Sequence, residues 1–183
     1  MPRALNTGTR EIPLKFARHL SDIVRAEWES GALLERVTPV TKELLTFWFA
    51  DAFCELRSIN FHEGQKQAIL NTVYLHELVK PESVFDMYTA VSSDITAEMD
   101  IAYLRKDKFS HPKYCHKMAT GTGKTWVLDA LVIWQYLNAK YEKERSGLFS
   151  KRFLLVAPGL IVSRYVLSRH ASSCKKGFAP RVR

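Results

Sequence analysis

The sequence predicts an α/β domain with a parallel sheet, preceded by an α-helical region at the N-terminus. A segment of apolar tendency, 114–118, leads into the glycine turn A-T-G-T-G-K-T, and a long helical run follows at 126–141. A second apolar run, R-F-L-L-V-A at 152–157, is typical of a parallel strand that is covered on both faces. Strand, turn, helix and strand in this order form one right-handed βαβ unit.

Length and composition indicate a globular chain. Its 183 residues suit one domain, or one domain with a fragment of another. The hydrophobic share of 46% and the aromatic share of 11% fit a packed core and argue against disorder. We expect a helical region at 1–58 and a truncated α/β nucleotide-binding domain at 59–183.

Helical periodicity is clearest in the N-terminal region. Apolar residues recur at helical spacing over 14–28, and Gly31 is expected to end that helix. Thr38 followed by Pro39 predicts the cap and first turn of a second helix that reaches Cys54. A further helix is expected to begin near Gly64.

Cysteine and histidine spacing does not indicate a metal site. The three cysteines are odd in number and widely spaced, which does not suggest a disulfide framework and fits a reducing cytoplasm. Residues 1–12 lack the apolar core of a signal peptide, and no apolar run is long enough to span a bilayer, so no membrane partner is expected. Four histidines are expected at the surface or at an edge: His62, His76, His111 and His116.

The glycine turn has the chemistry of a phosphate-binding loop. Gly121 and Gly123 lack a Cβ, so successive N–H groups can point at one centre, and the following helix adds its N-terminal N–H groups. Lys124 is predicted to contact the β- and γ-phosphates, and the Thr125 hydroxyl to ligate Mg²⁺. The alternative is a turn that only caps a helix, with Lys124 solvated. The predicted phosphate-binding residues are Thr120, Gly121, Thr122, Gly123, Lys124 and Thr125.

The strict phosphate-loop pattern begins with glycine, whereas Met118 stands at that position here. The form A-T-G-T-G-K-T resembles that of superfamily-2 helicases and translocases, in which the first position is commonly not glycine. Upstream, I-N-F-H-E-G-Q-K-Q-A-I-L at 59–70 resembles the Q motif of the same helicases. The resemblance assigns Gln65 to the adenine edge and Phe61 to its face. The alternative is a solvated glutamine on a helix.

A third motif follows the second predicted strand. V-A-P-G-L-I-V at 156–162 resembles motif Ia, which touches the sugar–phosphate backbone of the bound strand in these helicases. The alternative is a plain turn after a strand. The resemblance implies nucleic-acid contacts from Pro158, Gly159, Leu160 and Arg164.

Together the three motifs resemble the nuclease/translocase subunit of type III restriction enzymes and related DEAD/DEAH-like helicases, over roughly residues 33–162. The resemblance implies an incomplete first RecA-like domain, with ATP and Mg²⁺ as cofactors and double-stranded DNA as partner. Hydrolysis drives movement along DNA in the intact family. A modification or specificity subunit is a further expected partner.

Charge is distributed unevenly. The net charge is +8, yet the nine basic residues after Glu144 have no acidic residue among them, so the first 144 residues sum to −1 (8 − 9). A basic end of this kind suits a polyanion such as nucleic acid. The alternative is a solvated tail without a partner.

The absence of Asp and Glu beyond Glu144 also means that no DE-x-x pair follows the phosphate loop. The motor family needs that pair for hydrolysis, so we expect an N-terminal piece that binds nucleotide at most. A truncated or frame-shifted reading frame would explain this feature. Two other readings remain open: a non-catalytic module that binds nucleic acid or a partner subunit, and a pseudogene product without a stable fold.

Overall fold

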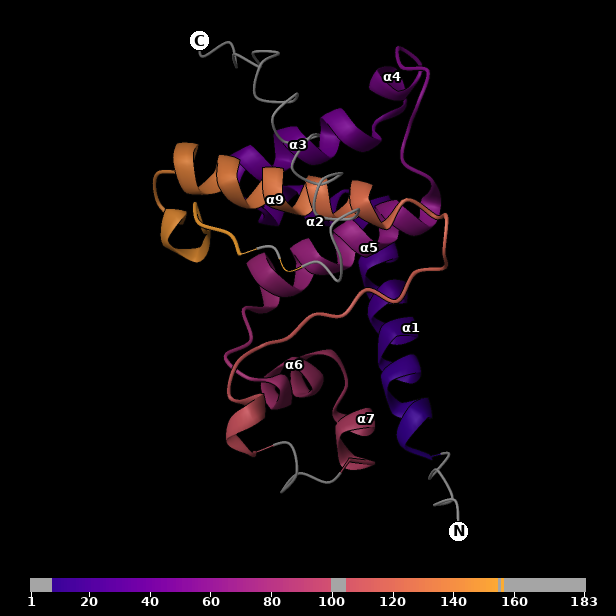
Figure 1. Cartoon of the computed structure of the whole chain (residues 1–183), viewed down its shortest axis with the longest axis vertical. Helices are drawn as coiled ribbons and strands as arrows, with labels where there is room; N and C mark the ends of the chain where they lie inside the picture. The colour runs from indigo at the N-terminus through magenta and orange to yellow at the C-terminus, as the bar shows by residue number, and fades with distance from the viewer. Residues whose placement is uncertain (1–7, 100–104, 155, 157–183) are drawn as a thin grey trace. The chain divides into compact units, whose positions relative to one another are not determined.

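All regular structure in the residues that the computed structural model describes, 8–99, 105–154 and 156, is helical (Figure 1). The chain divides into two units, Met1–Lys151 and Arg152–Arg183, and the described residues of the second unit form no helix or strand. The first unit contains α1 Gly8–Glu29, α2 Ala32–Arg36, α3 Pro39–Phe49, α4 Asp51–Cys54, α5 Glu63–Val73, the π-helix η1 Tyr74–Val79, α6 Val84–Val91, α7 Ser93–Ala97, the 3₁₀ turn η2 Asp107–Phe109, α9 Lys124–Tyr141 and the 3₁₀ turn η3 Ser146–Leu148.

The predicted α/β fold, an incomplete RecA-like domain with a parallel sheet, is wrong for the described residues, which contain no strand. Exposure alternates along 114–118 as in a strand, but the segment pairs with no strand among the described residues. Tyr114 and Met118 instead pack on the helical core, and His116 bonds to Thr72 of α5. A strand is stabilised by backbone hydrogen bonds to a neighbouring strand. Residues 114–118 are held instead by side-chain contacts with helices.

Helix α1 buries one stripe, as its periodicity predicts. Phe16, Leu20 and Val24 are all buried at four-residue spacing. The ring of Phe16 lies 4.3 Å from that of Tyr88 on α6, and α6 and α7 both pack against α1. The helix predicted at 14–28 is therefore confirmed, and it begins six residues earlier, at Gly8. Within the described residues no helix is long and apolar enough to cross a membrane.

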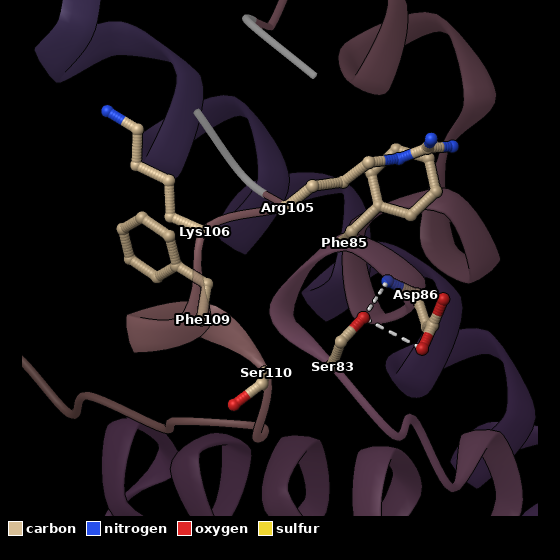
Figure 2. Close-up of a pocket in the computed structure, with 7 residues that line it drawn as sticks. All are labelled: Ser83, Phe85, Asp86, Arg105, Lys106, Phe109 and Ser110. Carbon is tan, nitrogen blue, oxygen red and sulfur yellow. Dashed lines mark hydrogen bonds between the residues drawn. The ribbon is translucent and has the colours of Figure 1, made fainter. Parts of the chain in front are cut away.

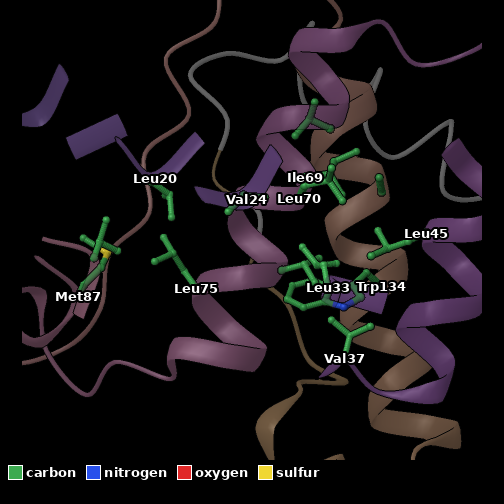
Figure 3. Packing of buried hydrophobic residues seen from close by; sticks show 14 of the residues in the cluster. Leu20, Val24, Leu33, Val37, Leu45, Ile69, Leu70, Leu75, Met87 and Trp134 are labelled. Carbon is green, nitrogen blue, oxygen red and sulfur yellow. The ribbon is translucent and has the colours of Figure 1, made fainter. Parts of the chain in front are cut away.

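Helices α3 and α5 pack on α9, where the largest buried side chains meet (Figure 3). Leu45 of α3, Ile69 of α5 and Trp134 of α9 are almost fully buried there. The Thr38 hydroxyl accepts a bond from the backbone N–H of Thr41, which confirms the predicted cap. The second predicted helix, which was expected to reach Cys54, divides at the extended residue Ala50 into α3 and α4.

The π-helix η1 continues α5 without a break. It ends at Lys80, which has a left-handed φ of 52° directly before Pro81. Within η1 the side chain of Glu77 is 1% exposed, so a carboxylate lies in the core. A buried carboxylate requires hydrogen-bond donors, and it finds them on two other segments.

Three donors converge on Glu77. Its Oε2 accepts from the backbone N–H of Thr38 at 2.8 Å. Its Oε1 accepts from the indole N–H of Trp134 at 2.9 Å and from the Thr41 hydroxyl. Asn138 of α9 extends the network, because its amide donates to the Thr41 hydroxyl at 2.9 Å. The network thus joins η1 to the start of α3 and to the middle of α9.

Replacement of this carboxylate tests the network. Glu77→Ala removes the acceptor of the Thr38 N–H and of the Thr41 hydroxyl, and one of the two acceptors of the Trp134 indole N–H, which also donates to the Thr41 oxygen at 2.9 Å. We expect a loss of about 3 kcal/mol or more in the free energy of unfolding. Glu77→Gln restores one acceptor oxygen but turns an NH₂ group toward a donor, so its loss should lie between Ala and wild type. Urea unfolding followed by circular dichroism measures both, with Glu43→Ala on the exposed side of α3 as the control. Equal stability of Glu77→Ala and Glu43→Ala would contradict the network's role.

Candidate functional site

The glycine turn lies directly before helix α9. Gly121 and Gly123 have left-handed φ angles of 82° and 69°, and α9 begins at Lys124. Residues other than glycine rarely adopt such angles. Left-handed residues between others of ordinary conformation turn consecutive N–H groups to one side, which creates an anion-binding concavity. The two glycines of the turn therefore adopt angles that glycine is needed for.

Side chains of the turn bond back to its own backbone. The ammonium group of Lys124 donates to the carbonyl oxygens of Met118 and Ala119, both at 2.8 Å. The Thr122 hydroxyl donates to the same Ala119 oxygen at 2.7 Å. Thr120 is exposed, whereas Thr125 is half-buried in the first turn of α9. The six predicted phosphate-binding residues thus lie together, as neighbours in sequence must.

Gln65 lies beneath the turn. Only 6% of the residue is exposed, and its Nε2 donates to the carbonyl oxygens of Thr122 at 3.1 Å and Gly123 at 3.3 Å. Its Oε1 accepts from the backbone N–H of His62 at 3.0 Å. A Cβ on Gly123 would lie 2.4 Å from Nε2, so only glycine allows this approach. The structure therefore brings Gln65 to the phosphate loop, although 57 residues separate it from Thr122.

His62 is the residue of this site that sequence reasoning missed. Its exposed position agrees with the expectation, but its Nε2 lies 3.1 Å from the Thr122 oxygen. Its Nδ1 accepts from the N–H groups of Gly64 and Gln65, which closes a capping box at the start of α5. The sequence signal for this role was the capping-box pattern, in which a side chain that can accept a hydrogen bond stands three residues before a glutamine at the start of a helix.

Phe61 belongs to an aromatic cluster beside the turn. Its ring lies 5.9 Å from that of Trp126 in the first turn of α9, at an interplanar angle of 85°. Trp48 and Phe49 of α3 approach its other sides at 6.0 and 5.6 Å. These contacts fix the ring near the loop and anchor the N-terminal end of α9 to α3. Contact with adenine stays a prediction.

His116 fixes the segment that leads into the turn. The Thr72 hydroxyl donates to the Ala68 oxygen at 2.9 Å, so toward His116 Nε2, at 3.0 Å, it acts as the acceptor. That assignment places the imidazole proton on Nε2. Burial lowers the pKa of His116 below its ordinary value of 6.5. His116 is half-buried, which fits the edge position of the expectation and not a fully exposed one.

The predicted nucleic-acid residues cannot be placed with the others, because Pro158, Gly159, Leu160 and Arg164 lie outside the described residues. A separate pocket of about 360 Å³ opens between α6 and the segment at 105–110 (Figure 2). The guanidinium of Arg105 lies 5.4 Å from the centre of the Phe85 ring there. Asp86 faces the same pocket, so its lining carries both signs of charge, and no residue of the phosphate loop reaches it.

Acid pH tests the burial of His116. A lowered folded-state pKa means that the unfolded chain takes up the proton first, so this stabilisation is complete above about pH 6.5 and is lost as the pH falls through the folded value. His116→Gln keeps a donor for Thr72 but does not titrate. Below pH 6.5 the urea midpoint of wild type should therefore fall faster than that of His116→Gln. His111→Gln, at an exposed histidine, is the control, and parallel profiles for all three proteins would contradict the effect.

One comparison with known proteins finds a matching family model. The family model described as "Type III restriction enzyme, res subunit" matches residues 58–176, about two thirds of the chain. That interval contains the phosphate loop, Gln65 and His62. No curated protein and no solved structure gives a significant match. Because the match covers more than half of the chain, the chain belongs to the family of type III restriction enzyme res subunits, an ATP-binding family of the helicase and restriction-enzyme type.

Proposed function

We propose that the chain is the ATP-binding part of a DNA helicase or translocase of the restriction-enzyme type. One observation carries the proposal: a loop with two left-handed glycines opens directly onto the N-terminus of an 18-residue helix, with Lys124 as its first residue. The first turn of an α-helix has N–H groups without partners inside the helix, and its dipole places a partial positive charge there. Phosphate groups are the natural ligand of that arrangement.

The roles within the loop follow from chemistry. Gly121, Thr122 and Gly123 would offer backbone N–H groups to the phosphates, and Lys124 would add a positive charge on the β- and γ-groups. Magnesium, when bound with the nucleotide, would neutralise phosphate charge and take the Thr125 hydroxyl as a ligand. What we propose for this chain is the binding of nucleotide.

Bonds of the Gln65 amide to the protein compete with its proposed contact to adenine. The amide of Gln65 can form four hydrogen bonds, and three of them already go to the protein. Adenine would need both a donor and an acceptor from it, so the amide would have to leave at least one loop carbonyl. Phe61 could offer its half-buried ring to the base without such an exchange.

DNA is the proposed partner of the whole motor. The family supports interaction with DNA at a coarse level, and the acid-free stretch after Glu144 supplies nine basic residues. Backbone contacts at Pro158, Gly159, Leu160 and Arg164 are proposed from the motif alone. Sequence recognition would fall to a modification or specificity subunit, since the described residues contain no element that we can assign to base contacts.

Replacement of Lys124 tests the proposal. Charge-assisted bonds to phosphate are among the strongest in proteins, so Lys124→Ala should weaken Mg·ATP binding by roughly a hundredfold or more. Isothermal titration calorimetry on the purified chain measures the affinity. Lys143→Ala removes the same charge from an exposed position beyond α9 and is the matched control. Equal affinity of both variants would refute the phosphate-loop assignment, and no binding by folded wild type would refute ATP binding itself.

A second candidate function is a non-catalytic module that binds nucleic acid, which the basic C-terminal composition favours. Affinity for DNA should then fall roughly a thousandfold between 50 and 200 mM salt if about six phosphates are contacted, and Mg·ATP should leave it unchanged. Fluorescence anisotropy with a labelled duplex measures this. Lys175→Ala/Lys176→Ala should reduce the salt slope by about 2, unlike the control Lys106→Ala/Lys108→Ala. An ATP-dependent affinity would favour the motor.

A further inference from the structure

Two side chains at the start of α5 bond to carbonyl oxygens of the phosphate loop. We propose that His62 and Gln65 are positioning residues: they hold the carbonyl groups of Thr122 and Gly123 and thereby aim the N–H groups of the loop at phosphate. The inference rests on the proposed nucleotide site. It assigns Gln65 a role other than contact with adenine, and it assigns a functional role to His62, for which the sequence predicted none.

The planarity of the peptide bond links the two sides of the loop. The carbonyl of Thr122 and the N–H of Gly123 share one peptide plane and point in opposite directions, because the peptide is trans. The carbonyl of Gly123 and the N–H of Lys124 form the next plane. Hydrogen bonds that draw both carbonyls toward α5 therefore turn both N–H groups away from α5. These are two of the N–H groups on which phosphate binding depends.

His62 can make its contact in only one tautomer. Its Nδ1 accepts from the backbone N–H groups of Gly64 at 3.1 Å and Gln65 at 3.4 Å, so the lone pair lies on Nδ1. The proton is then on Nε2, which donates to the Thr122 oxygen at 3.1 Å. One neutral ring thus caps α5 and holds the loop. Thr122 receives a second donor from Gln65 at 3.1 Å, so both lone pairs of this carbonyl are used.

Gln65 contributes through a side chain that is itself fixed. Its Oε1 accepts from the N–H of His62, and its two Nε2 hydrogens go to the carbonyls of Thr122 and Gly123. Because the residue is buried, an amide turned toward solvent or adenine would take one of two donors from each carbonyl, since Thr122 also accepts from His62 and Gly123 also accepts from the backbone N–H of Trp126 at 2.9 Å. Gly123 completes the fit, since a Cβ at that position would displace the amide. The observed loop conformation thus depends on histidine at position 62, glutamine at position 65 and glycine at position 123.

Two variants separate this role from its alternatives. His62→Asn keeps a good helix cap but is too short to reach Thr122. Gln65→Glu keeps an acceptor for His62 but has no hydrogen to donate to the carbonyls. Gln67→Glu is the matched control, because Gln67 lies on the same helix and bonds to Ser21 and Asn71, away from the loop. Calorimetry on the whole chain would compare Mg·ATP, Mg·GTP and magnesium tripolyphosphate.

We expect His62→Asn and Gln65→Glu each to weaken all three ligands by a similar factor, about five- to tenfold, while Gln67→Glu matches wild type. A loss confined to ATP in Gln65→Glu, with tripolyphosphate unchanged, would overturn the positioning role and support adenine reading. Unchanged binding of all ligands by His62→Asn would overturn the role of His62 and leave it as a helix cap alone.

A measurement without ligand keeps this inference distinct from the proposed function. The carbonyl ¹³C resonances of Thr122 and Gly123 report their hydrogen bonds. They should shift in His62→Asn and Gln65→Glu and stay in place in Gln67→Glu. Resonances that stay in place in all variants would overturn the inference. If they shift but wild type binds no ligand, the loop contacts stand and the nucleotide function fails.

Discussion

A buried carboxylate determines where helix α9 lies, and the candidate site depends on that helix. Glu77 collects the backbone N–H of Thr38, the Thr41 hydroxyl and the indole N–H of Trp134. Each donor is buried, so a slip of any segment would leave a polar group in the core without a partner. Apolar packing tolerates small shifts in register, whereas this set of bonds does not. The network therefore holds η1, α3 and α9 in one relative arrangement.

The same continuous segment, α5 followed by η1, contacts α9 and the turn before it at two points along the helix axis. Glu77 bonds to Trp134 in the middle of α9, whereas His62 and Gln65 bond to the turn at its beginning. Phe61 adds an edge-on ring contact with Trp126 at that end. The helix that presents the phosphate loop is therefore fixed along its first half. A site built on rigid elements in this way keeps the position of its backbone well defined before a ligand binds.

Local signals in the sequence predicted local structure well. Thr38 with Pro39 marked the start of α3, and the glycines of A-T-G-T-G-K-T marked a turn with left-handed residues before a helix. The sheet failed because an alternating or apolar run becomes a strand only if a neighbour pairs with it, and 114–118 packs on helices instead. The contacts of Glu77 and His62 span 39 and 60 residues, and helical periodicity carries no information about such pairs.

The bonds from Lys124 to the carbonyls of Met118 and Ala119 have a consequence for affinity. An incoming phosphate competes with these two internal acceptors for the same ammonium group. If the ammonium is released in only about a tenth of the molecules, the apparent dissociation constant is about tenfold above the intrinsic one. The chain would then bind nucleotide at higher concentrations than a loop with a free ammonium group would. The strength of the two bonds to the carbonyls would determine the apparent dissociation constant.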